Sequence, residues 1–165
     1  MDGEAVDVCK LVVADLLTRV NTFAVTGWTP RRAFVPQFKL KDIKDVQVVV
    51  CHASRTGERE NRGRVVREIG IYVGVLKLLD STSSDQAASE EDLAELDGLV
   101  LLMEQLQQLF VPEETPPDEP PTPYVVGTNG KYLATEAAAV PLYSIEDMKE
   151  RRQFTGVLSV KFRAA

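Results

Sequence analysis

Apolar and polar side chains alternate most regularly in the last quarter of the chain. From Gln153 onward one side of a period-two pattern is mostly polar, with Val157 as the exception, and the other side consists of Phe154, Leu158, Val160 and Phe162. This alternation predicts a half-buried antiparallel strand. Such a strand needs a sheet around it, which can belong to the same subunit or to a neighbouring one.

Two segments show the three- and four-residue spacing of an amphipathic helix. The first covers residues 5–20. The second begins at Ser89, whose hydroxyl can cap the first turn while the acids of Glu90–Asp92 complement the helix dipole. The buried stripe predicted for it consists of Leu93, Leu96, Val100, Met103, Leu106 and Phe110, widened by Leu99, Leu102 and Leu109.

Shorter patterns predict further strands. Arg31–Val35 lies between two prolines and fits a short edge strand, where proline is tolerated. The β-branched run Val46–Cys51 and the alternating run Ile69–Val75 predict two strands. The polar segment Ser54–Arg64 joins them, so the three together predict an extended hairpin.

The remaining elements complete the fold prediction. Asn129-Gly130 predicts a tight turn before a strand over Tyr132–Val140, and Ser144–Asp147 predicts the start of a short helix. We expect an α+β fold: an antiparallel β-sheet with two main α-helices packed on one face and a long β-hairpin arm. The length fits one domain over residues 1–165. Its loops are expected at Asp80–Ala88 and, as an acidic, proline-rich and extended segment, at residues 112–123.

Composition excludes some function classes. The net charge is −6 and the sequence pI is about 4.9, which disfavours a nucleic-acid-binding protein because that affinity depends on a basic surface. No apolar run has the length of about 20 residues that crosses a bilayer, and we expect no secretory signal. Cys9 and Cys51 are expected to be separate buried thiols in a reducing compartment.

Candidate chemistry is sparse. His52 is the only histidine, and Ser54, two residues further along the strand, is expected to point the same way; no motif orients either side chain for acid–base work. One histidine and two distant cysteines give no zinc spacing. The segment Gly127–Tyr132 has the wrong spacing for a phosphate loop. We therefore expect no enzyme activity, no catalytic residues, no cofactor and no metal.

The arm carries the strongest local charge pattern. Arg55, Arg59, Arg62 and Arg64 stand against two glutamates, Glu58 and Glu60. A nucleic-acid contact is disfavoured because no aromatic residue is interleaved for base stacking. Two readings remain open: a solvated hairpin tip, or an arm that reaches a neighbouring subunit, where arginine pairs well with carboxylates. The acids at Glu113–Glu119 and Glu90–Asp92 are candidate counterparts for the second reading.

The order of these segments resembles the tail-terminator, or tail-completion, proteins of tailed bacteriophages and prophages. The resemblance rests on Pro36-Gln37-Phe38 with Leu40–Ile43, on the strand Ile69–Lys77, and on Pro141–Ser144 with Arg152–Leu158, of which the last is the most telling. It covers most of the chain except the acidic, proline-rich loop, which departs from the compact pattern of that group.

The resemblance implies a structural virion protein without enzyme activity. It implies a homo-oligomeric ring, a hexamer in that group, which caps the tail tube, ends tube polymerisation and offers a docking face to the head. The implied partners are the tail-tube protein and a head–tail connector protein, with no membrane and no sequence-specific nucleic acid. The implied location is the virion at the head–tail joint, and the host cytoplasm during assembly. The implied interface residues are Arg55, Arg59, Arg62, Arg64, Arg151 and Arg152.

Two other functions remain as alternatives. Another neck or head–tail connector component would use the same kind of surface with a different neighbour. A small ligand-binding or enzymatic α+β domain built on His52 and Arg55 would instead require a concave pocket around His52.

Overall fold

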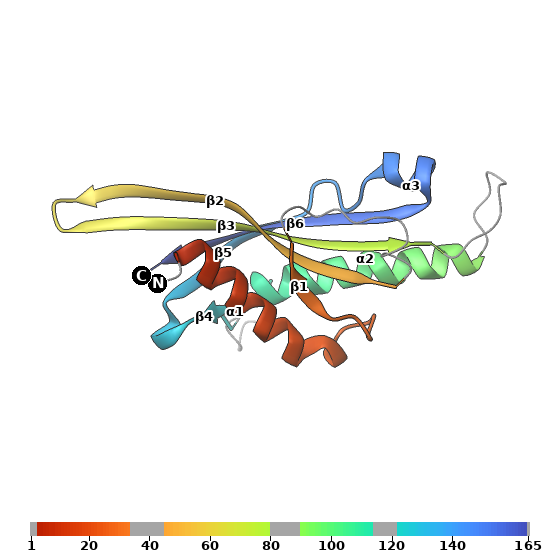
Figure 1. Ribbon diagram of the computed structural model, residues 1–165, viewed down its shortest axis with the longest axis horizontal. Coiled ribbons are helices and arrows are strands. Elements are labelled where there is room, and N and C mark those ends of the chain that lie inside the picture. Colours follow the sequence, from red (N-terminus) through yellow and green to blue (C-terminus); the bar gives the residue numbers. More distant parts are fainter. Residues whose placement is uncertain (1–2, 34–44, 80–89, 114–121, 165) are drawn as a thin grey trace.

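The computed structural model describes residues 3–33, 45–79, 90–113 and 122–164, and Figure 1 shows a single mixed sheet with helices against it. The sheet has six strands in the order β1-β2-β3-β6-β5-β4. The α+β prediction is therefore confirmed. The elements are α1 (Glu4–Arg19), β1 (Pro30–Arg32), β2 (Gln47–Asn61), β3 (Arg64–Leu78), α2 (Glu90–Phe110), β4 (Val125–Val126), β5 (Tyr132–Ala138), α3 (Ile145–Arg151) and β6 (Gln153–Ala164).

The final strand, β6, lies in the centre of its own sheet. It pairs with β3 along its whole length, from Gln153 opposite Leu78 to Ala164 opposite Arg67. On its other side, the half from Ser159 onward pairs with β5. Both edges of that half are satisfied within one subunit, so a neighbour's sheet is not needed to explain this strand.

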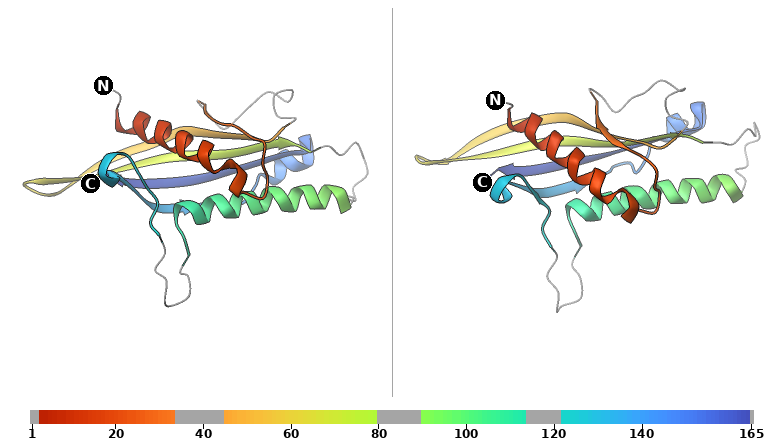
Figure 2. Two further views of the ribbon diagram at one scale, coloured as in Figure 1. Left: turned by 90° about the horizontal axis from the view of Figure 1, so that it is seen from below. Right: turned by 60° about the horizontal axis from the view of Figure 1, so that its bottom comes forward.

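Two helices cover one face of the sheet (Figure 2). The alternation in β6 places Phe154, Leu158, Val160 and Phe162 in the main hydrophobic core, where α1 and α2 meet the sheet. Aromatic rings close one part of it: Phe110 of α2 stacks edge-on against Tyr124, with ring centroids 4.8 Å apart. A smaller cluster on the opposite face contains Val49, Cys51 and Leu76.

Most predicted elements are present, and three details are wrong. The polar segment Ser54–Arg64 is mostly strand and not a connection between strands, because β2 continues to Asn61 and β3 begins at Arg64. The edge strand β1 pairs with β2 in parallel, at Pro30–Val48, whereas the other strand pairs are antiparallel as expected. Leu93 is 47% exposed, because the buried face of α2 is centred on residues further along the helix: Leu99, Leu102, Met103, Leu106 and Phe110.

Local turn chemistry agrees with the sequence. Asn129 has φ 58° and Gly130 has φ +64°, the left-handed values that a tight hairpin turn requires, and the turn joins β4 to β5. Ser144 caps α3 by accepting a hydrogen bond from the Asp147 N–H at 3.2 Å. The segments 34–44, 80–89 and 114–121 lie outside the described residues; they include the motifs Pro36–Phe38 and Leu40–Ile43, Ser89 and most of the acidic loop.

Gly156 marks the closest approach of a helix to the sheet. A Cβ atom built there would lie 2.7 Å from Met103 Sδ and 3.0 Å from the backbone oxygen of Leu142. Both are below normal contact distance, and the second atom belongs to backbone that cannot rotate away. Glycine in this strand therefore allows α2 and the segment before α3 to pack on β6.

We predict that Gly156→Ala destabilises the protein by about 1–3 kcal/mol, the usual cost of overpacking. Urea denaturation would show a lower midpoint at an unchanged m-value. The control is Gly57→Ala, where the nearest atom to the added Cβ, Val65 Cγ1, lies at 3.8 Å. We expect that control to change stability by less than about 0.5 kcal/mol. Equal effects at the two positions would contradict this packing account.

Candidate functional site

The β2–β3 hairpin extends beyond the rest of the sheet (Figure 1). Strand β6 reaches Arg67 and no further, so residues 54–66 form a two-stranded ribbon for most of their length. Every residue from His52 to Val65 is exposed. Asn61 Oδ1 accepts a hydrogen bond from the Gly63 N–H at 3.0 Å and so helps to close the tip. We call residues 54–66 the arm.

One side of the arm is basic. The cross-strand pairs Arg55–Ile69, Gly57–Arg67 and Arg59–Val65 place Arg55, Arg59 and Arg67 on the side that, further along the sheet, faces the helices. Glu4, in the first turn of α1, lies 2.7 Å from Arg67 Nε and 3.8 Å from Arg55. That single carboxylate serves two arginines at the base of the arm, so this side keeps an excess of positive charge.

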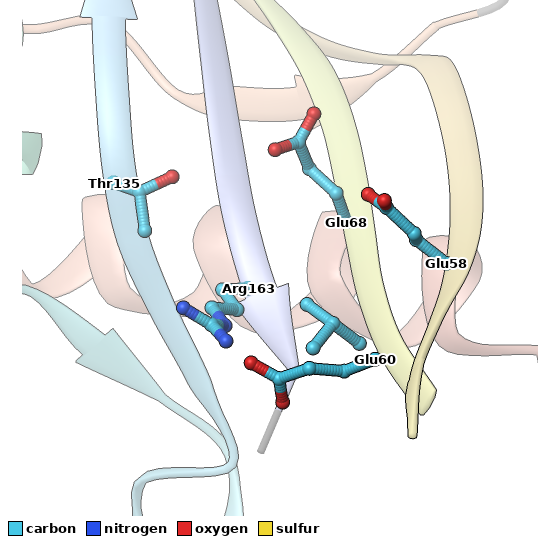
Figure 3. A pocket seen from close by; sticks show the side chains of 6 residues that line it. Glu58, Glu60, Glu68, Thr135 and Arg163 are labelled. Carbon is cyan, nitrogen blue, oxygen red and sulfur yellow. The ribbon is translucent and has the colours of Figure 1, made fainter. Parts of the chain in front are cut away.

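The other side of the arm is acidic. Thr56 pairs with Glu68 and Glu58 pairs with Val66, which places both glutamates on the face away from the helices. Figure 3 shows them at an open hollow of about 420 Å³, with Arg163 of β6 and Thr135 of β5 across from the hairpin. Glu60 also lines this hollow. Three carboxylates and the guanidinium of Arg163 line the hollow. Glu60 also pairs with Arg64 at 3.2 Å, and Glu68 lies 4.0 Å from Lys161.

The structure divides the six predicted interface arginines between two places. Arg55 and Arg64 already have carboxylate neighbours, Glu4 for Arg55 at 3.8 Å and Glu60 for Arg64 at 3.2 Å. Arg59 and Arg62 make no ion pair with any described residue. The remaining two arginines are not on the arm.

Arg151 and Arg152 lie at the opposite end of the sheet, where α3 ends (Figure 1). The backbone of Arg152 forms the connection between α3 and β6. It has φ 49°, its N–H donates a hydrogen bond to the Met148 carbonyl oxygen at 3.2 Å, and its own carbonyl oxygen accepts one from the Leu79 N–H at 2.9 Å. Beside α3 is a second, mainly apolar hollow of about 400 Å³, lined by Val140, Pro141, Ser144, Ile145, Glu146, Thr155 and Val157.

The expected common direction of His52 and Ser54 is wrong. A β-bulge between them inserts one extra residue, so His52 pairs with Ile71 while Ser54 pairs with the next residue, Gly70. Their side chains therefore point to opposite faces of the sheet. His52 is exposed, and its Nε2 lies 3.2 Å from a guanidinium nitrogen of Arg32. Neither hollow described above is lined by His52.

Sequence reasoning identified the arginines and missed the acidic side. The signal was present as an alternation along the first strand of the arm, where Arg55 and Arg59 are at odd positions and Glu58 and Glu60 at even positions. Reading it requires knowing that the strand continues through the polar segment to Asn61.

The two cysteines are separate free thiols, as expected. Complete burial of Cys9 raises the pKa of its thiol to about 11, and burial also raises the pKa of Cys51. Thiols in such surroundings are poor nucleophiles. Within the described ranges, no group of three or more His, Cys, Asp or Glu side chains is arranged to hold a metal ion.

None of the described helices is both long and apolar enough to span a membrane. Comparison of the chain with protein-family models and with curated proteins finds no match.

The buried thiol predicts a loss of stability in alkaline solution. The unfolded chain releases the Cys9 proton near pH 9 and the folded chain near pH 11. The folded state therefore binds more protons between these values, and the free energy of unfolding falls as pH rises, by up to about 1.4 kcal/mol per pH unit. Cys9→Ala should reduce this slope between pH 9 and 10 in denaturation experiments. An unchanged slope would show that ionisation of the Cys9 thiol does not cause the fall in the free energy of unfolding.

Proposed function

We propose that this protein assembles into a ring that caps a bacteriophage tail tube, ends tube polymerisation and provides the docking face for the head. Two lines of support converge. The sequence resembles tail-terminator proteins, most clearly over Arg152–Leu158. The observation that carries the proposal is the arm, a charged ribbon whose residues from His52 to Val65 are all exposed.

An isolated two-stranded ribbon is marginally stable in water. Among the described residues, no strand pairs with the outer edge of β2 beyond the three residues that β1 covers. Exposed strand edges are either blunted by charge or paired with another chain. In an oligomer both the edge and the charged sides of the arm gain partners, which gives a physical reason to keep a long ribbon outside the core.

A neck or head–tail connector component is the second candidate, because it would use the same arm against a different neighbour. The two roles differ in their effect on tail length. A ligand-binding or enzymatic role built on His52 and Arg55 has less support, because His52 lines neither of the two hollows described above.

We predict that removing the arm abolishes the oligomer and spares the fold. Replacing Glu58–Val66 by Asn-Gly would join the paired residues Gly57 and Arg67 through a two-residue turn. The deleted residues lie outside the hydrophobic core, so stability should change by no more than about 1 kcal/mol. Analytical ultracentrifugation over a concentration series should detect the ring for the intact chain only. Rings of unchanged stability from the shortened chain would contradict the role of the arm.

We further predict that tails assembled without this protein grow beyond their normal length, because nothing stops tube polymerisation. Electron microscopy of particles from the deletion strain, complemented by the intact gene as control, measures this directly. Tails of normal length that fail to join heads would instead support the connector role and contradict the terminator role.

A further inference from the structure

The two sides of the arm differ in charge, although Glu60 on the acidic side already pairs with Arg64 at 3.2 Å. This difference determines which partner fits the arm. The basic side presents Arg59, with Arg62 in the turn at the tip, and neither pairs with a described carboxylate. The acidic side presents Glu58, Glu60 and Glu68 around the hollow in Figure 3. Glu58 has no ion-pair partner among the described residues, and Lys161 reaches Glu68 only at 4.0 Å.

We propose that the basic side of one arm docks into the acidic hollow of a second copy of this chain. Arg59 and Arg62 of one subunit then meet Glu58, Glu60 and Glu68 of the next. This inference rests on the proposed ring and names the contact that builds it. It replaces the acidic segments Glu90–Asp92 and Glu113–Glu119 as the counterparts of the arm.

The hollow suits a guanidinium. Its volume of about 420 Å³ lies within the range of small-ligand pockets. Its carboxylates come from β2 and β3, so they approach an incoming side chain from neighbouring strands. Arginine can donate to two carboxylate oxygens at once, which fixes its orientation as well as its charge.

The geometry also determines the symmetry of the contact. Because the donor and acceptor surfaces lie on opposite sides of one ribbon, two copies cannot satisfy each other reciprocally through the same patch. The contact is head-to-tail, and such contacts close into rings when the rotation between copies permits. The arm thus supplies both surfaces of a repeating interface: its basic side contacts one neighbour, and its acidic side contacts the other.

A charge-swap experiment tests the proposal. The variant R59E/R62E makes both sides of the arm acidic, and the variant E58R/E60R makes both sides basic. Each variant alone should form rings with an apparent dissociation constant raised at least about a hundredfold, since like charges then face each other. A one-to-one mixture should restore rings in which the two variants alternate, which an even-numbered ring such as a hexamer allows.

The matched control is K131E/K149E, which changes the net charge as much as R59E/R62E at exposed lysines off the arm. It should assemble as the unmodified chain does. Circular dichroism checks that all variants fold. Sedimentation in the same buffer measures assembly, and native mass spectrometry of the mixture measures its composition.

The outcomes separate this inference from the proposed function. If the unmodified chain forms rings and both swapped variants form rings equally well, the proposed contact between arm and hollow is wrong. The proposed ring is then still supported. If each variant alone assembles more weakly and the mixture does not restore ring assembly, the arginines bind a different partner surface. This result also overturns the inference. If the unmodified chain forms no ring at any concentration or on tail tubes, the ring and this contact both fail.

Discussion

The pairing of β3 with β6 is the constraint on which the structure depends. Each residue of β6 from Gln153 to Ala164 has a partner on β3, and the helix-facing residues are buried from Ile69 to Val75 on β3 and from Phe154 to Ala164 on β6. Beyond Arg67 the partner ends, while the hairpin continues to its turn at Arg62-Gly63. The length difference between β6 and the β2–β3 hairpin therefore creates the arm. The proposed assembly depends on the arm, because no described strand of the same subunit pairs with it beyond the β2–β3 hairpin.

Patterns within single elements made much of the fold predictable. The alternation at Phe154–Phe162, the turn at Asn129-Gly130 and the start of a short helix at Ser144–Asp147 depend on neighbours in sequence, and the structure confirms each of them. The position of β6 in the middle of the sheet was not predictable, because strand order depends on pairings between distant segments. The exposure of Leu93 was also missed, because helical periodicity does not reveal which turns of a helix overlap the sheet.

The candidate site was only half predictable for a similar reason. The arginines of the arm are visible in the sequence, but their division into sides depends on register. The β-bulge between His52 and Ser54 shifts that register by one residue, which separates those two side chains and sets the register from Ser54 to Arg59; a second shift follows between Arg59 and Asn61. Arg152 was expected at an interface, yet its left-handed backbone and its two backbone hydrogen bonds make it a joint between α3 and β6.

Hydrogen exchange measured by mass spectrometry on free and assembled protein tests the central claim most directly, that the arm gains its partner only from another molecule. Amides of residues 54–66 should exchange rapidly in the free subunit, whereas those of β6 exchange slowly because they are paired and buried. On assembly, protection should rise in the arm and remain unchanged in β6. An arm that stays unprotected in the assembled state would contradict the account.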